Sequence, residues 1–431
     1  MSTVHSLRSH TPSGVRVLAL TTLQQAGLTV VRFGLPILAP FWRDALHLSL
    51  GQVGMLLAAF DFGSLLLFIP IGLLADRWGE PAVLTAGALF TAAMTMLITR
   101  AQTFGSLAGL LVIAGLGYGS GQTAGTKAVS AAFGAGGRGT AMGVRQSGLP
   151  LGGLIAAVFL PPLAGAFGWQ TAIAGAAAVC AVPGILCWLG LRDTREPAPV
   201  SGTPSAPSAA AAGPGLPIST QLREILRASG VMRTAWTATL LVIVQFCYQG
   251  YLALYLVDRF RWSKHAAAAV LIAVHLGGVT GRLAWGALSD AAYHGRRVPA
   301  LAWCVGAGLL FPIVLVVLPS ASKGPAVSLA AFAGGILLLG WNGLYSTLIT
   351  ELAGPRLGAT AMGVSMTMLY AATMFTLPAF GWLVDHTAYT VGWTSLVGVM
   401  ALALAATFRI PEPTGAAVIL AKGETTGGSG A

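Results

Sequence analysis

Long apolar stretches alternate with short polar segments along most of the chain, and this pattern predicts helices that cross a membrane. An α-helix needs roughly 20 apolar residues to span the hydrocarbon core of a bilayer, and it satisfies its backbone hydrogen bonds within one segment. We therefore predict an all-α membrane protein with twelve transmembrane helices, at residues 16–41, 50–75, 82–99, 105–130, 139–166, 169–191, 232–257, 265–288, 298–319, 326–350, 359–384 and 389–409.

One polar segment is longer than the others and divides the apolar stretches into two sets of six. Its residues 195–220 are rich in Pro, Ala, Ser and Gly, a composition that forms no packed core and is typical of a linker. The predicted organisation is a cytoplasmic N-terminal tail, a six-helix bundle, a cytoplasmic linker, a second six-helix bundle and a cytoplasmic C-terminal tail, at residues 1–15, 16–191, 192–231, 232–410 and 411–431.

The two sets of six stretches also resemble each other in sequence. Gly72 and Asp76 recur at the same spacing as Gly286 and Asp290, and the residues at 140–144 are identical to those at 360–364. Parallel repeats of this kind are found in transporters built from two related halves. The repeat predicts two pseudo-symmetric bundles.

Composition supports a location in lipid. Charged residues are 9% of the chain, against about 25% in soluble domains, and the mean hydropathy is +0.77. The net charge of +11 does not indicate nucleic-acid binding, because the basic residues stand singly in short loops. More of the lysines and arginines fall in the segments that share a side with the termini, which predicts a multi-pass protein of the plasma (inner) membrane with both termini cytoplasmic.

The sequence lacks the motifs of an enzyme. It has no phosphate-cradling G-x-x-x-x-G-K-[ST] loop and no credible nucleophile–base set. Its four cysteines lie inside apolar stretches without metal-ligand spacing, so we read them as small buried residues. We expect neither cofactor nor metal.

A polar turn between the second and third stretches carries the most specific motif. It matches the pattern G-x-L-a-D-r-x-G at six positions, whereas Glu80 and Pro81 replace the basic pair that usually follows; the matching residues are Gly72, Leu74, Ala75, Asp76, Arg77 and Gly79. This turn resembles the loop between helices two and three of the major facilitator superfamily of transporters. The resemblance extends over residues 15–410 and implies two six-helix bundles that work by alternating access.

The resemblance also implies gating residues. In that family the acid of one half's loop contacts the start of a helix in the other half, where the helix dipole attracts negative charge. Carried over, Asp76 would meet the start of the eleventh stretch and Asp290 the start of the fifth, near Arg145. The gating candidates are Gly72, Asp76, Arg77, Gly79, Arg145, Arg282, Gly286 and Asp290. A contact of Arg145 with an anionic substrate is the alternative for that residue.

Ionisable residues inside the apolar stretches are costly and mark pathways or paired sites. Arg32 and Asp61 lie at matching depths on the first two stretches, which predicts an ion pair near the midplane. The offset that relates Asp76 to Asp290 also relates Asp61 to His275, and histidine titrates near physiological pH. The proton-coupling candidates are Asp61, His275 and Glu351. A fixed structural pair and a satisfied core histidine are the alternatives.

The resembled family lines its cavity with the first, fourth, seventh and tenth helices. Polar residues there supply the substrate-binding candidates Arg32, Gln122, Lys127, Gln249, Asn342 and Tyr345. The apolar stretches contain more cations than acids: Arg32, Lys127, Arg145 and Arg282 against Asp61 and Glu351. A buried excess of positive charge is costly unless an anion neutralises it. We therefore predict proton-coupled movement of a small organic anion, a carboxylate, by a monomer whose other partner is the lipid bilayer.

Two further functions remain open at this stage. The fifth stretch contains Gly148, Pro150, Gly152 and Gly153, a partial resemblance to the G-P-x-x-G-G motif of drug–proton antiporters. It favours a proton-antiport exporter of drugs or metabolites, although close helix crossing also needs small residues and a kink. The other alternative is a membrane sensor of the same fold that transports nothing.

Overall fold

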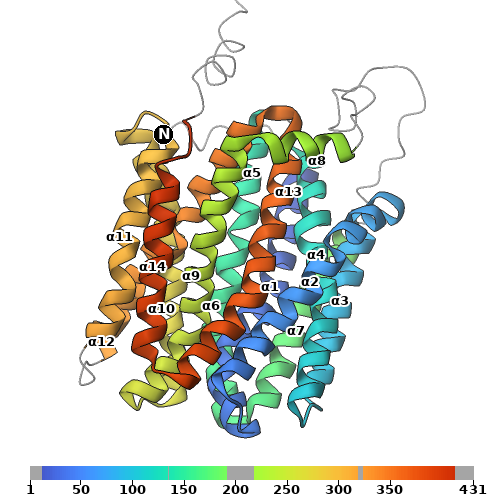
Figure 1. Cartoon of the computed structure of the whole chain (residues 1–431). Coiled ribbons are helices and arrows are strands. Elements are labelled where there is room, and N and C mark those ends of the chain that lie inside the picture. The colour runs from blue at the N-terminus through green and yellow to red at the C-terminus, as the bar shows by residue number, and fades with distance from the viewer. Residues whose placement is uncertain (1–11, 134, 192–217, 319–323, 413–431) are drawn as a thin grey trace, which may run out of the picture. The chain divides into compact units, whose positions relative to one another are not determined.

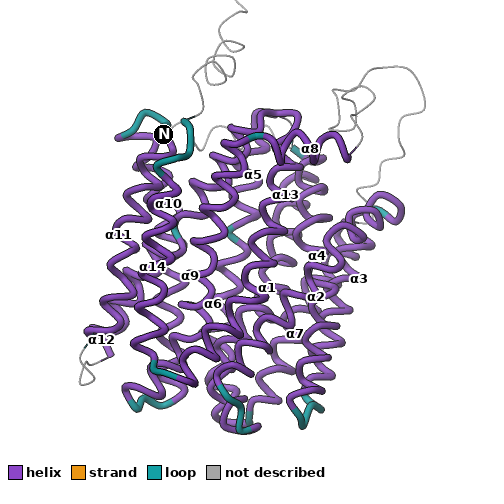
Figure 2. Tube along the Cα trace, in the orientation of Figure 1, coloured by secondary structure: helices purple, strands orange, loops and turns teal. Residues whose placement is uncertain are grey.

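The computed structural model describes residues 12–133, 135–191, 218–318 and 324–412, and within these ranges every regular element is a helix (Figure 2). The predicted tails and linker lie largely outside the described residues. The helices, labelled in Figure 1, are α1 (Pro12–Leu46), α2 (Leu50–Trp78), α3 (Glu80–Ile98), α4 (Phe104–Ala132), α5 (Ala135–Gln146), α6 (Gly148–Phe167), α7 (Trp169–Leu191), α8 (Ile218–Arg227), α9 (Ser229–Phe260), α10 (Lys264–Ala292), α11 (Arg297–Val317), α12 (Gly324–Leu339), α13 (Trp341–His386) and α14 (Tyr389–Thr407).

Eleven segments among the described residues are long and apolar enough to cross a membrane. The first predicted span, α1, is not one of them, because Gln24, Gln25 and Arg32 interrupt its apolar residues. It is nevertheless a continuous helix of 35 residues. The prediction of an all-helical membrane fold is confirmed.

Three predicted spans differ in detail from the helices observed. Residues 139–166 form α5 and α6, which meet at Ser147. Pro150 contributes to this break because it has no N–H to donate to the carbonyl of Gln146. The tenth and eleventh spans share α13, which bends at Gly354, where φ is 73° and ψ is 172°. Glycine suits that position because a residue without a Cβ adopts positive φ at little cost.

The chain divides into two compact units, which we describe separately. The first comprises residues 1–214, 247–276 and 374–386, and the second residues 215–246, 277–373 and 387–431. Segments of α9, α10 and α13 thus group with the first seven helices. The predicted boundary between bundles at the linker stays a prediction, because it follows chain order whereas these units follow packing.

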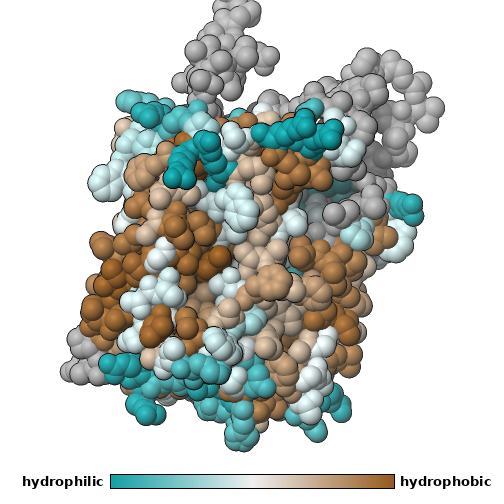
Figure 3. Space-filling model, in the orientation of Figure 1, coloured by the Kyte–Doolittle hydropathy of each residue, from teal (hydrophilic) through white to brown (hydrophobic). Residues whose placement is uncertain are grey.

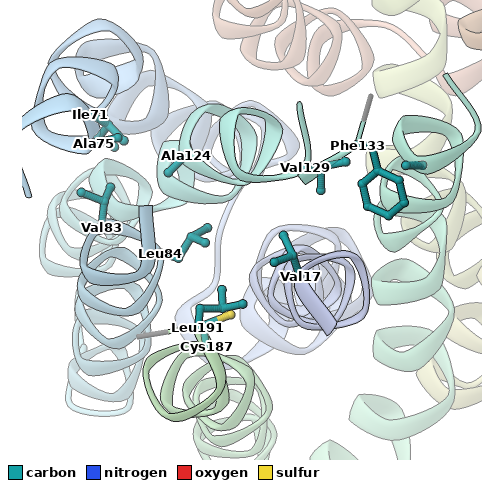
Figure 4. Packing of buried hydrophobic residues seen from close by; sticks show 11 residues of the cluster. Val17, Ile71, Ala75, Val83, Leu84, Ala124, Val129, Phe133, Cys187 and Leu191 are labelled. Carbon is teal, nitrogen blue, oxygen red and sulfur yellow. The ribbon is translucent and has the colours of Figure 1, made fainter. Parts of the chain in front are cut away.

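In the first unit, apolar residues from successive helices form a continuous core. α2 and α3 pack along α4, and α1 packs along α6 and α7. Figure 4 shows one part of this core, where Val17 of α1, Leu84 of α3, Ala124 of α4 and Cys187 of α7 come together. The small side chains at Ala124 and Cys187 let these helices approach closely. In the second unit, α11 packs against α14 and α12.

Large apolar side chains also cover the outside of the helices. Figure 3 shows apolar residues over the middle of the visible helices and hydrophilic residues at helix ends. Exposed examples are Phe167, Leu283, Trp303, Leu329, Phe375 and Phe408. Apolar surface of this extent is rare on a soluble monomer and is suited to contact with lipid.

Candidate functional site

Arg32 of α1 and Asp61 of α2 form a buried, bidentate ion pair. Arg32 Nε donates to Asp61 Oδ1 at 2.7 Å, and Arg32 Nη2 donates to Asp61 Oδ2 at 3.0 Å. The two residues are 7% and 3% exposed. The planar guanidinium matches both carboxylate oxygens, which is the strongest geometry for such a pair. The predicted pairing is confirmed, and its part in proton coupling stays a prediction.

Aromatic rings surround this pair. The guanidinium carbon of Arg32 lies 5.3 Å from the ring centroid of Phe33 and 5.8 Å from that of Tyr118. Tyr118 in turn packs edge-on against Phe60, with ring centroids 5.5 Å apart. The rings exclude water, and their faces attract the cation, so the charges interact in a low dielectric.

His275 of α10 lies next to the same aromatic group. It is buried, and its ring centroid is 5.2 Å from that of Phe33, the neighbour of Arg32 in sequence. Its imidazole also covers Gly153 of α6, where an added Cβ would come within 2.4 Å of the ring. The structure thus brings two of the proton-coupling candidates, Asp61 and His275, into one region of the first unit.

Arg145, at the end of α5, has a different environment. It is fully buried, and its guanidinium donates to Gln25 Oε1 at 3.1 Å, to Thr126 Oγ1 at 3.2 Å and to the carbonyl of Gly121. Its Nε finds no acceptor among the described residues. All acceptors that the described residues supply to Arg145 are therefore neutral.

Gln24 lies beside this group and adds a further polar atom without a partner. Its Nε2 donates to the carbonyl of Leu84 at 3.2 Å, whereas its Oε1 is buried and lacks a donor among the described residues. Gln24, Gln25 and Thr126 are not among the substrate-binding candidates of the sequence analysis. Two adjacent amides inside an apolar stretch were the available signal, but only the fold shows that Gln25 contacts Arg145.

Lys127 and the loop motif lie nearer the ends of the helices. Lys127 Nζ pairs with Glu80 Oε1 at 3.1 Å, and the two side chains are 44% and 26% exposed. Arg77 is exposed, and Gly79 ends α2 with φ of 83°. The side chains at Gly72 and Asp76 lie outside what the structure describes. Gln122 is half-buried on α4. The roles proposed for these residues stay predictions.

In the second unit, Arg297 lies close to both the gating candidate Asp290 and the proton-coupling candidate Glu351. Arg297 Nη1 lies 2.6 Å from Asp290 Oδ1, and Arg297 Nε lies 3.8 Å from Glu351 Oε1. Sequence analysis placed Arg297 in a loop and gave it no role. Asp290 belongs to the second unit and Arg145 to the first, so the predicted contact between them stays a prediction.

The remaining candidates have polar partners or buried polar atoms. Asn342 Nδ2 donates to Gln245 Oε1 at 2.9 Å, and Tyr345 donates its hydroxyl hydrogen to Ser365 Oγ at 2.5 Å. Arg282 has a buried Nε without an acceptor among the described residues. Gln249 is buried in the first unit, and Gly286 is half-buried on α10.

Comparison with known proteins identifies relatives over most of the chain. An uncharacterized MFS-type transporter of Mycobacterium tuberculosis is 27% identical over 400 residues, covering 92% of this chain and 85% of the relative. The hexuronate transporter of Bacillus subtilis is 24% identical and covers 89% and 91%. The 3-(3-hydroxy-phenyl)propionate transporter of Escherichia coli is 27% identical and covers 75% of each chain.

A solved structure and a family model agree with these relatives. The crystal structure of a bacterial homolog of the human lysosomal transporter Spinster matches with a TM-score of 0.78 and 18% identity, covering 93% of this chain and 98% of that one. The family model described as Major Facilitator Superfamily matches residues 22–376. The family and the relatives are transporters and not enzymes. The chain therefore belongs to the Major Facilitator Superfamily of membrane transporters.

Proposed function

We propose that this protein moves a small organic carboxylate together with protons across the plasma membrane by alternating access. The observation that carries the proposal is Arg145, a fully buried guanidinium whose described partners are all neutral. We further propose a monomer with both termini in the cytoplasm, so that the end where α1 finishes and α2 begins faces outward. The bias of basic residues supports this orientation.

Among the three intramembrane cations of the first unit, Arg145 is the one to which the described residues supply no carboxylate. Arg32 is neutralised by Asp61, and Lys127 is paired with Glu80. Arg145 instead keeps its positive charge among an amide, a hydroxyl and a backbone carbonyl. Burying a charge without a counterion is costly. A substrate carboxylate would lower that cost, which makes Arg145 the preferred anion contact.

The relatives support an acidic substrate. The names of two of them specify hexuronate and 3-(3-hydroxy-phenyl)propionate, and both of these compounds are carboxylates. A guanidinium binds a carboxylate with two parallel hydrogen bonds. We therefore propose that the substrate carboxylate takes the Nε of Arg145 as one donor, since this atom has no acceptor among the described residues.

Coupling to protons is proposed for the Arg32–Asp61 pair and His275. The pair has two protonation states: Asp61 ionised and bound to Arg32, with no net charge, or Asp61 protonated and released, which leaves the positive charge of Arg32. His275 shares the aromatic contact at Phe33, and an imidazole can accept and release a proton, so we propose that it exchanges a proton near Asp61.

The exporter alternative receives less support, because packing accounts for its motif. An added Cβ at Gly148 would lie 2.8 Å from the carbonyl of Thr22, and one at Gly152 would lie 2.4 Å from the carbonyl of Ala26. These glycines let α6 approach α1 closely, a role that requires no particular substrate.

Uptake by proteoliposomes tests the proposal. The panel should contain hexuronates, arylpropionates, their uncharged amides and cationic dyes, each with and without an inward proton gradient. We expect saturable uptake of a carboxylate that the gradient accelerates, and no uptake of the amides. In Arg145→Gln we expect KM to rise by at least about tenfold, the effect of losing a charged hydrogen bond.

Two controls keep this result specific. Arg145→Lys retains the charge and should recover part of the affinity, whereas Arg100→Gln removes an exposed arginine that is no site candidate and should leave KM unchanged. Unchanged KM in Arg145→Gln would overturn Arg145 as the substrate contact. Uptake of dyes but not of carboxylates would overturn the anion proposal and favour the exporter.

A further inference from the structure

The N-terminus of α2 is bound by a carboxylate from a helix far along the chain. The amide N–H of Leu50 donates to Asp385 Oδ1 at 3.0 Å, and that of Gly51 donates to Asp385 Oδ2 at 2.7 Å. Asp385 lies in the last turn of α13, and all three residues belong to the first unit. The partial positive charge at a helix N-terminus favours an anion at this position.

The other amides at this helix end have local acceptors. Gln52 N donates to Ser49 Oγ at 3.2 Å, and Ser49 N donates to Gln52 Oε1 at 2.9 Å, which together form a capping box. The first four amides of a helix lack partners within it. Counted from the N-cap residue Ser49, two of the four amides have acceptors on Ser49 and Gln52, and Asp385 supplies acceptors for the other two. The contact of Asp385 therefore links α13 to α2 and adds to a cap that α2 already has.

A tyrosine from a third helix joins the same place. The buried hydroxyl of Tyr251, on α9, lies 2.6 Å from the carbonyl oxygen of Leu377 on α13 and 3.1 Å from that of Leu50 on α2. Its single hydrogen is shared between the two acceptors. The ring of Tyr251 also packs on Phe380, with centroids 4.8 Å apart. Three helices thus meet around one hydroxyl.

Glycines allow the backbones of α2 and α13 to approach this closely. A Cβ added at Gly54 would lie 2.3 Å from the carbonyl oxygen of Leu377, and one added at Gly381 would lie 2.2 Å from that of Leu50. Real Cβ atoms do not come so near a backbone oxygen. A residue other than glycine at either position would therefore push α2 and α13 apart. We call this contact of α2, α9 and α13 the seam.

Two ion pairs lie on the same end of these helices. Arg43, in the last turn of α1, pairs with Asp258 of α9, and the next residue, Asp44, pairs with Lys264 at the start of α10. Their side chains are partly to well exposed, so each pair contributes little by itself. Together with Asp385 they connect α1 and α2 to α9, α10 and α13 at this end.

We propose that Asp385 is a gating residue that holds the seam closed. Its carboxylate binds the amides of Leu50 and Gly51 while the seam is closed. When the seam opens, the carboxylate is hydrated by water instead. Asp385 is exposed in the last turn of α13, where water can hydrate its carboxylate, so we take the contact to be reversible. The proposal rests on alternating access, which is part of the proposed function, and it requires no particular substrate.

Labelling of a buried cysteine measures opening of the seam directly. Leu57, on α2, is buried, and its side chain lies 3.0 Å from the position of a Cβ added at Gly250 of α9. We would introduce Leu57→Cys after replacing the four native cysteines, and follow its reaction with a membrane-impermeant maleimide in nanodiscs. We expect Asp385→Asn to raise the labelling rate by about fivefold, because a carboxylate at a helix N-terminus is replaced by a neutral amide.

Ser49→Ala is the matched control. It removes the local cap from the same helix end and leaves both Asp385 hydrogen bonds in place, so it should not raise the labelling rate. An equal rise in Ser49→Ala would show that Asp385 only caps α2. If Asp385→Asn fails to fold, Tyr251→Phe decides the question, and we expect it to raise the rate by about twofold through loss of one neutral hydrogen bond.

Parental labelling rates in the folded variants would overturn the proposal. Labelling needs no substrate and no proton gradient, so its failure leaves the anion proposal intact. A failed uptake panel likewise leaves the gate proposal intact.

Discussion

Two buried arginines in the first unit show how the same side chain acquires different properties from its partners. Arg32 donates to both oxygens of a carboxylate from one edge of its guanidinium, through Nε at 2.7 Å and Nη2 at 3.0 Å. Arg145 faces an amide, a hydroxyl and a backbone carbonyl among the described residues. Hydrogen bonding is extensive in both cases, but only the first case cancels the charge.

This difference separates two tasks. A closed ion pair carries no net charge, whereas protonation of its carboxyl opens the pair and leaves the charge of the guanidinium, so the pair suits a proton switch. A guanidinium surrounded by dipoles keeps its net charge and attracts an anion. The comparison teaches that counting hydrogen bonds does not reveal which cation is available to a substrate; counting opposite charges does.

The largest expected effect comes from breaking the closed pair. Asp61→Asn leaves the guanidinium of Arg32 buried without its counterion, and we expect it to lose about 3–5 kcal/mol of stability. Arg32→Ala should cost less, because a buried carboxyl can take up a proton whereas arginine keeps its charge. Thermal unfolding in detergent, measured together with uptake, gives both comparisons.

The double variant Arg32→Gln with Asp61→Asn sharpens that result. It removes both charges, so it should be more stable than Asp61→Asn alone. If it folds but does not transport, the pair acts in coupling; if it transports normally, the pair is structural. A double variant no more stable than Asp61→Asn would contradict the energetic argument.

A smaller effect on stability is expected at Arg145. Arg145→Gln should cost about 1–3 kcal/mol, since it removes a buried charge but leaves acceptors such as Gln25 Oε1 without their donor. The carboxylate substrate should raise the melting temperature of the parent but not that of this variant. A loss as large as that of Asp61→Asn would assign Arg145 a structural role and break the comparison.

The smallest effect is expected at the half-exposed pair of Lys127 and Glu80. Because the side chain of Lys127 is 44% exposed, Lys127→Gln should change stability by no more than about 1 kcal/mol. Glu80→Gln is the matched variant, and a double-mutant cycle measures their coupling. A raised KM in Lys127→Gln with unchanged stability would support Lys127 as a substrate contact, as the sequence analysis predicted.

Much of the fold could be predicted because the signals that define it are local. Apolar stretches of sufficient length predict helices, and chain position along two neighbouring helices predicts depth. Depth alone was enough to pair Arg32 with Asp61, because both residues lie a similar number of turns from the loop that joins α1 to α2. The motif at 72–79 and the internal repeat then pointed to the family.

The candidate site could be predicted only in part, because a partner depends on the rotation of each helix and on its neighbours. The depth of Arg145 did not reveal that it turns toward Gln25 and Thr126. The gating candidate Asp290 and the coupling candidate Glu351 both pair with Arg297, a residue without any motif.

The sequence by itself was enough to predict a helical membrane transporter of a known family, with charged residues inside its apolar stretches. The tertiary structure alone decided which of those charges are neutralised, and it placed Asp385 on the first amides of α2 although the two are more than 300 residues apart. The physical reason is that burial and periodicity act over a few turns of one helix. Counterions and helix caps depend instead on contacts between helices that only packing brings together.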